Sequence, residues 1–142
     1  MCNSSATDKF NRCVMVMNEA LQGGLLANAI AVMALTVGQR HPHLVGDELI
    51  DANQVNYPGL IPSGIPMLSS EQAALHELRE KALTAQCDVI CFPVIGQQTK
   101  NYDELKINMN ELTSNEVQYT GIAIVGEKKK VSKIVKNLPL IK

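Results

Sequence analysis

Polar side chains able to hold a ligand gather in two loops, each of which follows a predicted buried strand. The first loop, residues 18–24, follows the apolar run 13–17 and precedes an apolar segment of helix length. The second loop, residues 97–100, follows the apolar run 89–92. Ligands of open α/β sheets lie beyond the carboxyl ends of strands, beside the free N–H groups of a helix, so both loops are expected at one crevice. The candidate ligand-binding residues are Asn18, Glu19, Gly24, Asn28, Gln97, Thr99 and Lys100.

Each loop also has a purely structural interpretation. Gly23-Gly24 is a typical turn sequence, and Asn28 would then only satisfy the end of a helix. The second loop would only lead into a helix that Asn101 caps, with Glu104 at capping-box spacing. The chain contains no Gly-x-Gly-x-x-Gly and no Gly-Lys-Ser/Thr sequence, so the nucleotide-binding fingerprints are absent and no cofactor is predicted. Both interpretations stay open.

The last fifteen residues are strongly basic in a chain of nearly balanced charge. They hold six of the thirteen Lys and Arg residues and no acidic residue, although the whole chain has a net charge of −1. On a helix, Lys129, Lys133 and Lys136 fall opposite an apolar stripe. These lysines are candidates for binding an anion or an RNA backbone; the alternative is a solvated helix face near a helix C-terminus.

The histidines and cysteines do not form a metal-binding pattern. His41 and His43 stand alone, and Cys87 and Cys91 would lie ~13 Å apart on one strand. No metal site is predicted, and buried free thiols are expected. A cysteine nucleophile is equally unsupported, because nothing in the sequence places a histidine beside a cysteine.

The elements that must position these groups alternate between strands and helices. Continuous apolar runs predict buried strands at 13–17, 89–92 and 119–125, with a short strand at 65–68 and a hairpin at 48–57. Helices are predicted at 25–37 (closed by Gly38), 69–85 (with Ser69 and Gln72 as a capping box), 102–112 and 127–138. The first helix is apolar around nearly its whole circumference, so it is expected to be almost enclosed. This alternation predicts an α/β domain with a mostly parallel or mixed sheet.

Length and composition place these elements in one domain. A chain of 142 residues predicts a single domain over residues 11–142, behind a flexible tail of residues 1–10. The longest apolar run, residues 25–35, is interrupted by Asn28 and falls short of the ~20 residues that span a bilayer. The first nine residues lack the plan of a signal peptide. We therefore expect a cytoplasmic protein with no membrane partner and with reduced thiols.

Several segments resemble a bacterial domain-of-unknown-function family, the one numbered two thousand. The resemblance covers residues 11–141, and the segments that carry it are 13–19, 24–29, 38–42, 126–131 and 138–140, with Thr99 and Tyr102. The family is related in fold to type II peptidyl-tRNA hydrolases. The resemblance thus implies a three-layer α/β fold, a mixed sheet flanked by helices, and a homodimer.

The resemblance to the hydrolase itself is partial. The enzyme has Gly-Lys at the start of its first helix and Gln and His along it; the matching positions here are Gly24, Leu25, Ala29 and Val32. Its second motif, Asp-Ala-Gly-Arg-Thr or close to it, matches residues 95–99 and keeps only Thr99. Ester hydrolysis needs an activated water and a stabilised oxyanion, which Leu25 and Ile95 cannot supply.

Three functions follow as hypotheses. The favoured one is a protein of unknown function that keeps the hydrolase fold and binds a small ligand or partner in the crevice near Asn18, Asn28 and Thr99. The second is a divergent hydrolase of peptidyl-tRNA or a related ester or amide, working with other residues. The third is an RNA-associated module, with tRNA as a partner, that uses the lysine face.

Overall fold

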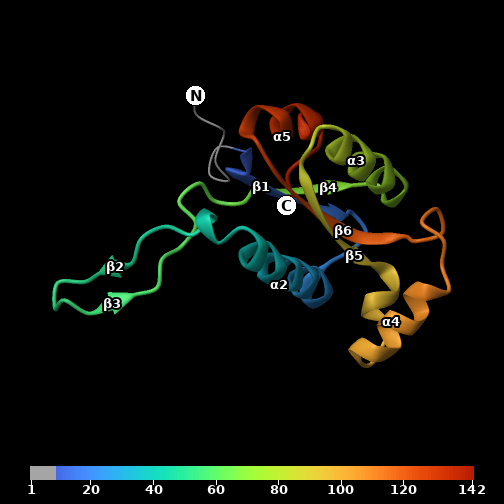
Figure 1. Ribbon diagram of the computed structural model, residues 1–142, viewed down its shortest axis with the longest axis horizontal. Helices are drawn as coiled ribbons and strands as arrows, with labels where there is room; N and C mark the ends of the chain where they lie inside the picture. Colours follow the sequence, from blue (N-terminus) through green and yellow to red (C-terminus); the bar gives the residue numbers. More distant parts are fainter. Residues whose placement is uncertain (1–8) are drawn as a thin grey trace.

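A four-stranded mixed sheet lies between two layers of helices in the computed structural model, which describes residues 9–142 (Figure 1). The strands of this sheet are β1 (Arg12–Asn18), β4 (Met67–Ser70), β5 (Asp88–Pro93) and β6 (Tyr119–Gly126). The helices are α2 (Gly23–Arg40), α3 (Gln72–Thr84), α4 (Tyr102–Asn110) and α5 (Lys128–Val135). Two further strands, β2 (Leu49–Ile50) and β3 (Asn56–Tyr57), form a separate hairpin.

The strand order β4-β1-β6-β5 brings three carboxyl ends to one edge of the sheet. Strand β4 is parallel to β1, and β6 is antiparallel to both β1 and β5. Strands β1, β4 and β5 therefore run in the same direction. The predicted α/β class and the mixed sheet are confirmed, and so are the strands expected at 13–17, 89–92 and 119–125.

The sheet has an apolar core on each face, because successive residues of a strand point to opposite sides. From β1, Cys13, Met15 and Met17 pack toward α2, while Val14 and Val16 pack toward α3 and α5. All eight residues of β6 are buried. A strand buried on both faces needs the continuous apolar run that the sequence contains.

Several helix ends differ from the sequence-based prediction, and at two of them the structure shows a different cap. Helix α2 continues through Gly38 to Arg40, so the predicted end at Gly38 is wrong. It stops where His41 precedes Pro42, because a residue before proline disfavours the helical conformation. The predicted Ser69 cap is also wrong: Ser69 belongs to β4, and Glu71 is the N-cap of α3 without a side-chain bond. The Asn101 cap is confirmed, since its Oδ1 accepts from the Glu104 N–H at 2.8 Å.

Helix α2 is not enclosed as its sequence predicts. The sheet covers the face that carries Ala29, Met33 and Val37. The opposite face is open: Leu35 is 79% exposed and Leu25 is 60% exposed. The helix thus has one buried side and one apolar side in contact with solvent.

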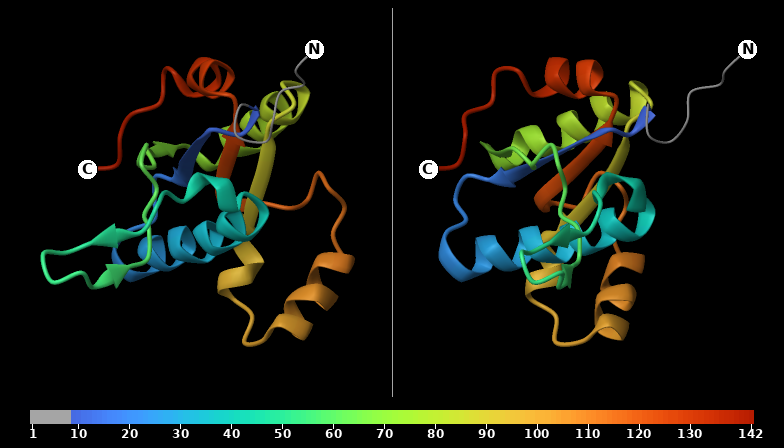
Figure 2. Two further views of the ribbon diagram at one scale, coloured as in Figure 1. Left: turned by 60° about the vertical axis from the view of Figure 1, so that its left-hand side comes forward. Right: turned by 90° about the vertical axis from the view of Figure 1, so that its left-hand side faces the viewer.

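The predicted hairpin is confirmed and projects from the body as an arm, residues 45–65 (Figures 1 and 2). At its tip, the Asp51 carboxylate accepts from the backbone N–H groups of Asn53 and Val55 and from the Tyr57 hydroxyl. At its base, the Gly46 N–H donates to the Leu60 carbonyl at 2.8 Å. A Cβ on Gly59 would overlap the backbone of Gly46, so the two segments at the base of the arm can approach here only because residue 59 is glycine.

A charged cluster joins the end of α2 to the start of β5. The Asp88 carboxylate accepts from the Arg40 guanidinium at 2.7 and 3.0 Å and lies 2.7 Å from Nε2 of the buried His41. The His41 ring lies 5.0 Å from the Phe10 ring. Burial opposes the charge on Asp88, but hydrogen bonds from Arg40 and His41 outweigh it, and the pKa of this carboxyl falls below its ordinary value.

We predict that Asp88→Asn lowers the free energy of unfolding by ~1.5–3 kcal/mol at pH 7, the range for a hydrogen bond to a charged group. Because the folded pKa of Asp88 is lowered, its stabilisation is present above the unfolded carboxyl pKa of 3.8 and is lost as pH falls through the folded value. Urea unfolding at pH 7 and at pH 3 measures the difference in unfolding free energy between Asp88→Asn and the unmodified chain. This difference should be smaller at pH 3. Asp47→Asn, in the exposed arm, is the control. A difference independent of pH would contradict this prediction.

Candidate functional site

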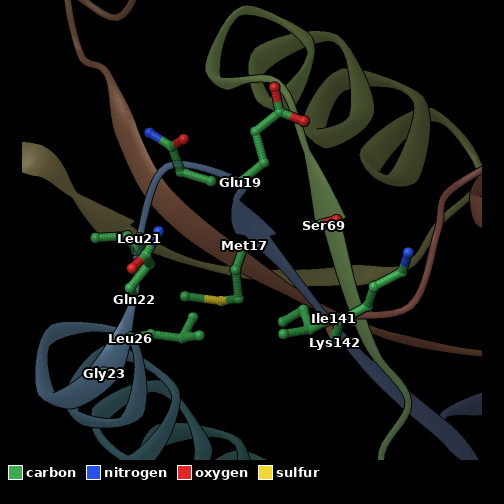
Figure 3. A pocket seen from close by; sticks show the side chains of 10 residues that line it. Met17, Glu19, Leu21, Gln22, Gly23, Leu26, Ser69, Ile141 and Lys142 are labelled. Carbon is green, nitrogen blue, oxygen red and sulfur yellow. The ribbon is translucent and has the colours of Figure 1, made fainter.

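A cleft of about 400 Å³ opens at the carboxyl ends of β1 and β4, in front of the first turn of α2 (Figure 3). Its floor is apolar: the side chains of Met17, Leu26 and Ile141 converge there (Figure 3). Its other lining residues are mainly polar, namely Asn18, Glu19, Gln22, Ser69 and Lys142, together with Leu21 and Gly23. The cleft lies where ligands of open α/β sheets bind.

The first turn of α2 offers unpartnered backbone donors to this cleft. The N-cap residue is Gln22, which makes no side-chain capping bond, and the first turn contains no acidic residue. The first N–H groups of a helix have no intrahelical acceptor, so those of Gly23 and Gly24 are free to bind oxygen atoms. The positive end of the helix dipole adds to their attraction for an anionic group.

The first predicted loop therefore lies at the cleft. The side chain of Asn18, however, has a structural role there. Asn18 uses its side chain to hold its own turn, since Oδ1 accepts from the Ala20 N–H at 3.0 Å. The Glu19 backbone is tied to β4 by a 2.9 Å bond to the Ser70 carbonyl, and its carboxylate points away from the apolar floor (Figure 3). Gly24 follows Gly23 in the first turn of α2 but is not among the residues that line the cleft, and a Cβ at this position would meet open space.

A hydrogen bond from Gln97 joins the second predicted loop to the first turn of α2. The Gln97 side-chain amide donates to the Leu25 carbonyl at 3.2 Å, which joins the turn after β5 to the first turn of α2. Thr99 bonds within its own turn, its N–H donating to the Ile95 carbonyl at 3.1 Å. The Lys100 N–H donates to the Glu104 carboxylate at 3.3 Å, so this residue belongs to the cap of α4. Lys100 thus takes part in the cap of α4, Thr99 bonds within the preceding turn, and Gln97 connects the second loop to the first turn of α2.

Asn28 lies at a different cleft from Asn18. It lines an apolar groove of about 640 Å³ between α2, β5 and α4, which we call the α2–α4 groove. The groove includes Val32 from α2, Ile90 and Phe92 from β5, and Leu105 and Met109 from α4. The predicted single crevice is therefore two clefts, separated by the first turn of α2 and its bond from Gln97.

Sequence reasoning missed Ser69, Gln22, Leu26 and the C-terminal Ile141 and Lys142 as cleft residues. Ser69 reaches the site because β4 pairs with β1 in parallel, with Met17 opposite Ser69. Ile141 reaches it because its N–H donates to the Met67 carbonyl at 2.9 Å. Two sequence signals lay near these positions: the predicted strand at 65–68, which ends one residue before Ser69, and the polar loop 18–24, which contains Gln22.

The lysine candidates divide between two places. Lys133 and Lys136 line a groove of about 550 Å³ between the end of α3 and α5, which we call the basic groove. Lys81 and Lys130 complete its set of four lysines, whereas Lys129 is exposed outside its lining. Lys81 is 3.3 Å from the Glu77 carboxylate.

The cysteines are not prepared for nucleophilic chemistry. Burial raises the pKa of the Cys13 thiol to about 11, and burial is also the main cause of the raised pKa of Cys87 and of Cys91. These thiols are protonated at neutral pH, and only a thiolate attacks or binds metal well. Within residues 9–142, no three His, Cys, Asp or Glu side chains lie together as metal ligands. Cys2 lies outside the described residues.

Comparisons with known proteins identify a family and a related fold. A structure of a protein of unknown function from Agrobacterium tumefaciens strain C58 superposes with a TM-score of 0.82 and 16% sequence identity, covering 95% of this chain and 98% of that one. At this identity the likeness concerns the fold alone. No curated protein matches the sequence. No helix in the described part of the chain is both long and apolar enough to cross a bilayer.

The family model described as "Protein of unknown function (DUF2000)" matches residues 11–142, nearly the whole chain and the same span in which the sheet, the helices and both clefts lie. The resemblance noted in the sequence is thereby confirmed, and the chain belongs to this DUF2000 family.

Proposed function

We propose that this chain binds a small molecule that carries both an apolar part and an anionic group in the cleft before α2. The observation that supports this most is the uncapped start of an 18-residue helix facing a cleft at the ends of two strands. The apolar floor of Met17, Leu26 and Ile141 suits the apolar part. The N–H groups of Gly23 and Gly24 suit a carboxylate or phosphate.

The proposal assigns binding and no hydrolysis. The positions that match the lysine and aspartate of type II peptidyl-tRNA hydrolases hold Leu25 and Ile95. The relationship of this fold to that enzyme is itself part of the proposal, supported by the mixed sheet with helices on both faces. The cytoplasmic location and the homodimer stay predictions.

A charge placed at the start of α2 tests the binding site. We predict that small carboxylates and phosphate esters raise the Tm of the protein and that Gly24→Asp abolishes this increase, because a negative charge in the first turn of α2 repels an anionic ligand there. The same variant should fold well, since an acid in the first turn stabilises a helix by ~0.3–1 kcal/mol. Thermal shift assays across a panel of such compounds provide the measurement.

Gly24→Ala is the matched control, because a Cβ at residue 24 meets open space and carries no charge. It should keep the ligand response and stabilise the helix by ~0.5–1 kcal/mol. The proposal fails if no compound in the panel raises the Tm, or if Gly24→Asp responds to the compounds as the unmodified chain does.

The divergent-hydrolase alternative has its own test. We expect no release of peptide from peptidyl-tRNA above the rate without protein, because neither Leu25 nor Ile95 can polarise a water molecule or stabilise an oxyanion. Turnover that Thr99→Ala removes would instead establish a hydrolase and replace the proposal of a binding protein.

RNA binding is the second candidate function, and the basic groove is the observation that favours it. Four lysines, Lys81, Lys130, Lys133 and Lys136, surround this groove, and no acidic residue lines it. Its apolar lining includes Ile134 and Ala85. Such a groove can follow a phosphate backbone without reading bases, and its affinity would depend steeply on salt.

We predict that neutralising Lys130 and Lys133 together to Gln reduces the slope of log Kd against log salt by about 1.4 for a single-stranded RNA. Lys128→Gln with Lys129→Gln is the matched control, since both lysines lie on the same helix outside the groove lining. Fluorescence anisotropy with a labelled oligonucleotide at several salt concentrations measures both slopes. If both double variants lose the same amount of slope, the RNA is attracted by the general charge of the helix, and binding in the basic groove is contradicted.

A further inference from the structure

Strand β5 is an open edge of the sheet. At the other edge, the C-terminal segment covers β4: the Ser69 N–H donates to the Pro139 carbonyl at 3.0 Å. The Ile141 N–H donates to the Met67 carbonyl of the same strand at 2.9 Å. Among the described residues, no segment pairs with the outer side of β5, and five of its six residues are partly exposed. An edge of this kind offers unpaired N–H and C=O groups to another strand.

The register of the sheet identifies the backbone groups of β5 that are unpaired. The Met15 N–H donates to the carbonyl that precedes β4, so the odd-numbered residues of β1 bond toward β4 and the even-numbered ones toward β6. The same alternation across β6 makes Ile90 and Phe92 the residues that bond to β6. The N–H and C=O groups of Val89 and Cys91 therefore point away from the sheet. Outside the strand ladder, no hydrogen bond within residues 9–142 uses these four groups.

The α2–α4 groove reaches this open edge. Ile90 and Phe92 line the groove, and both pack on the α2 face of the sheet. Cys91 also lines the groove, although its side chain packs on the opposite face, against the core cluster beneath α3. Because successive side chains of a strand point to opposite faces, Cys91 borders the groove at the edge of the strand. The apolar groove and the unpaired backbone groups are thus parts of one surface.

The charged groups beside this surface favour an acidic partner. The walls of the groove are mostly apolar, and the charged residue among them is Lys106, with no acid among the described residues that line it. On the other face of β5, the positive charge of Arg79 opposes the rise in the pKa of the Cys91 thiol that burial causes, so this cation lies near the edge as well. Arg79 also contacts the Glu80 carboxylate at 3.2 Å, which leaves Lys106 as the main charge for a partner.

An extended peptide matches all of these features together. Its backbone can pair with the free groups of Val89 and Cys91, and every second side chain then points toward the groove. A small apolar molecule would fill the groove but would leave the four backbone groups unpaired. Pro93 ends the edge because it has no N–H group, so the added segment is short, ~5 residues as in an ordinary strand.

We propose that the open edge of β5 and the α2–α4 groove together bind a short extended peptide segment of another protein, which adds to the sheet as a fifth strand. Apolar side chains at every second position of the peptide lie in the groove, and an acidic side chain lies beside Lys106. This surface is separate from the cleft before α2, and the proposal does not depend on ligand binding in that cleft.

Selection of a displayed library of random peptides of about nine residues on the full chain tests the proposal. We expect the enriched peptides to carry an apolar residue at every second position and at least one Asp or Glu. Fluorescence anisotropy then gives the Kd of one enriched, labelled peptide. N-methylation of alternate residues in this peptide removes the N–H donors on one side and keeps every side chain. Methylation on the side that faces β5 should raise the Kd at least ~10-fold, and methylation on the other side should leave it unchanged.

Variants of the chain locate the peptide on this surface. Cys91→Pro should raise the peptide Kd at least ~10-fold, because it removes an N–H that the sheet does not use and places a ring at the edge. Val32→Glu puts a charge in the apolar wall and should also weaken binding, whereas Leu35→Glu, exposed on the same helix outside the groove lining, is its matched control. Lys106→Glu should weaken binding, with Lys129→Glu on α5 as its control.

Three results would overturn the proposal. The first is a selection that enriches no peptide of the expected pattern. The second is an equal effect of N-methylation on the two sides of the peptide, which tests strand pairing with the unmodified chain even if Cys91→Pro does not fold. The third is an equal loss of binding in Val32→Glu and Leu35→Glu. Ligand binding in the cleft before α2 is measured by thermal shift without peptide, so either proposal can fail alone.

Discussion

The pairing of β1 with β6 is the interaction on which the other elements depend. It joins the two central strands over the register from Arg12 opposite Gly126 to Met17 opposite Gly121. Both strands are buried on both faces, so water does not reach their backbone N–H and C=O groups. Without the pairing, several buried backbone groups would have no hydrogen-bond partner. The glycines at the two ends of this register make room: a Cβ on Gly126 would meet the Cys87 sulfur, and one on Gly121 would meet the Met17 side chain.

The direction of β6 decides where polar groups meet. Because β6 runs against both of its neighbours, the carboxyl ends of β1, β4 and β5 share one edge. Helix α2 starts at that edge, and the bond from Gln97 to the Leu25 carbonyl ties the turn after β5 to its first turn. The opposite end of α2 is held by Asp88. The helix is thus fixed at both ends while its outer face stays open.

Three surfaces of different chemistry lie around the sheet and its helices. The cleft before α2 combines apolar floor residues with backbone donors, the α2–α4 groove is mostly apolar, and the basic groove gathers lysines. The cleft and the α2–α4 groove share helix α2, but no residue lines more than one of the three surfaces. A small ligand in the cleft and a polyanion in the basic groove would therefore not compete for one position, and the two proposals can be tested independently.

Local sequence patterns determine much of the fold without reference to tertiary contacts. The apolar runs of β1, β5 and β6 and the Asn101 cap are visible in the sequence because strand burial and capping depend on neighbouring residues. The sequence predicts the positions of the helix ends less accurately. Gly38 is compatible with a helix interior, and the choice between it and His41 depended on the proline that follows.

The candidate site required tertiary structure, because its residues come from segments distant in sequence. The sequence by itself identified two polar loops after buried strands, and hence Asn18, Glu19, Gly24 and Gln97 near one edge. Only the packing decided that Asn28 faces a different groove, that Ser69 and Ile141 enter the cleft, and that Lys130 with Lys81 replaces Lys129 in the basic groove. Strand order and helix rotation set these neighbours, and both depend on contacts between elements that no local pattern records.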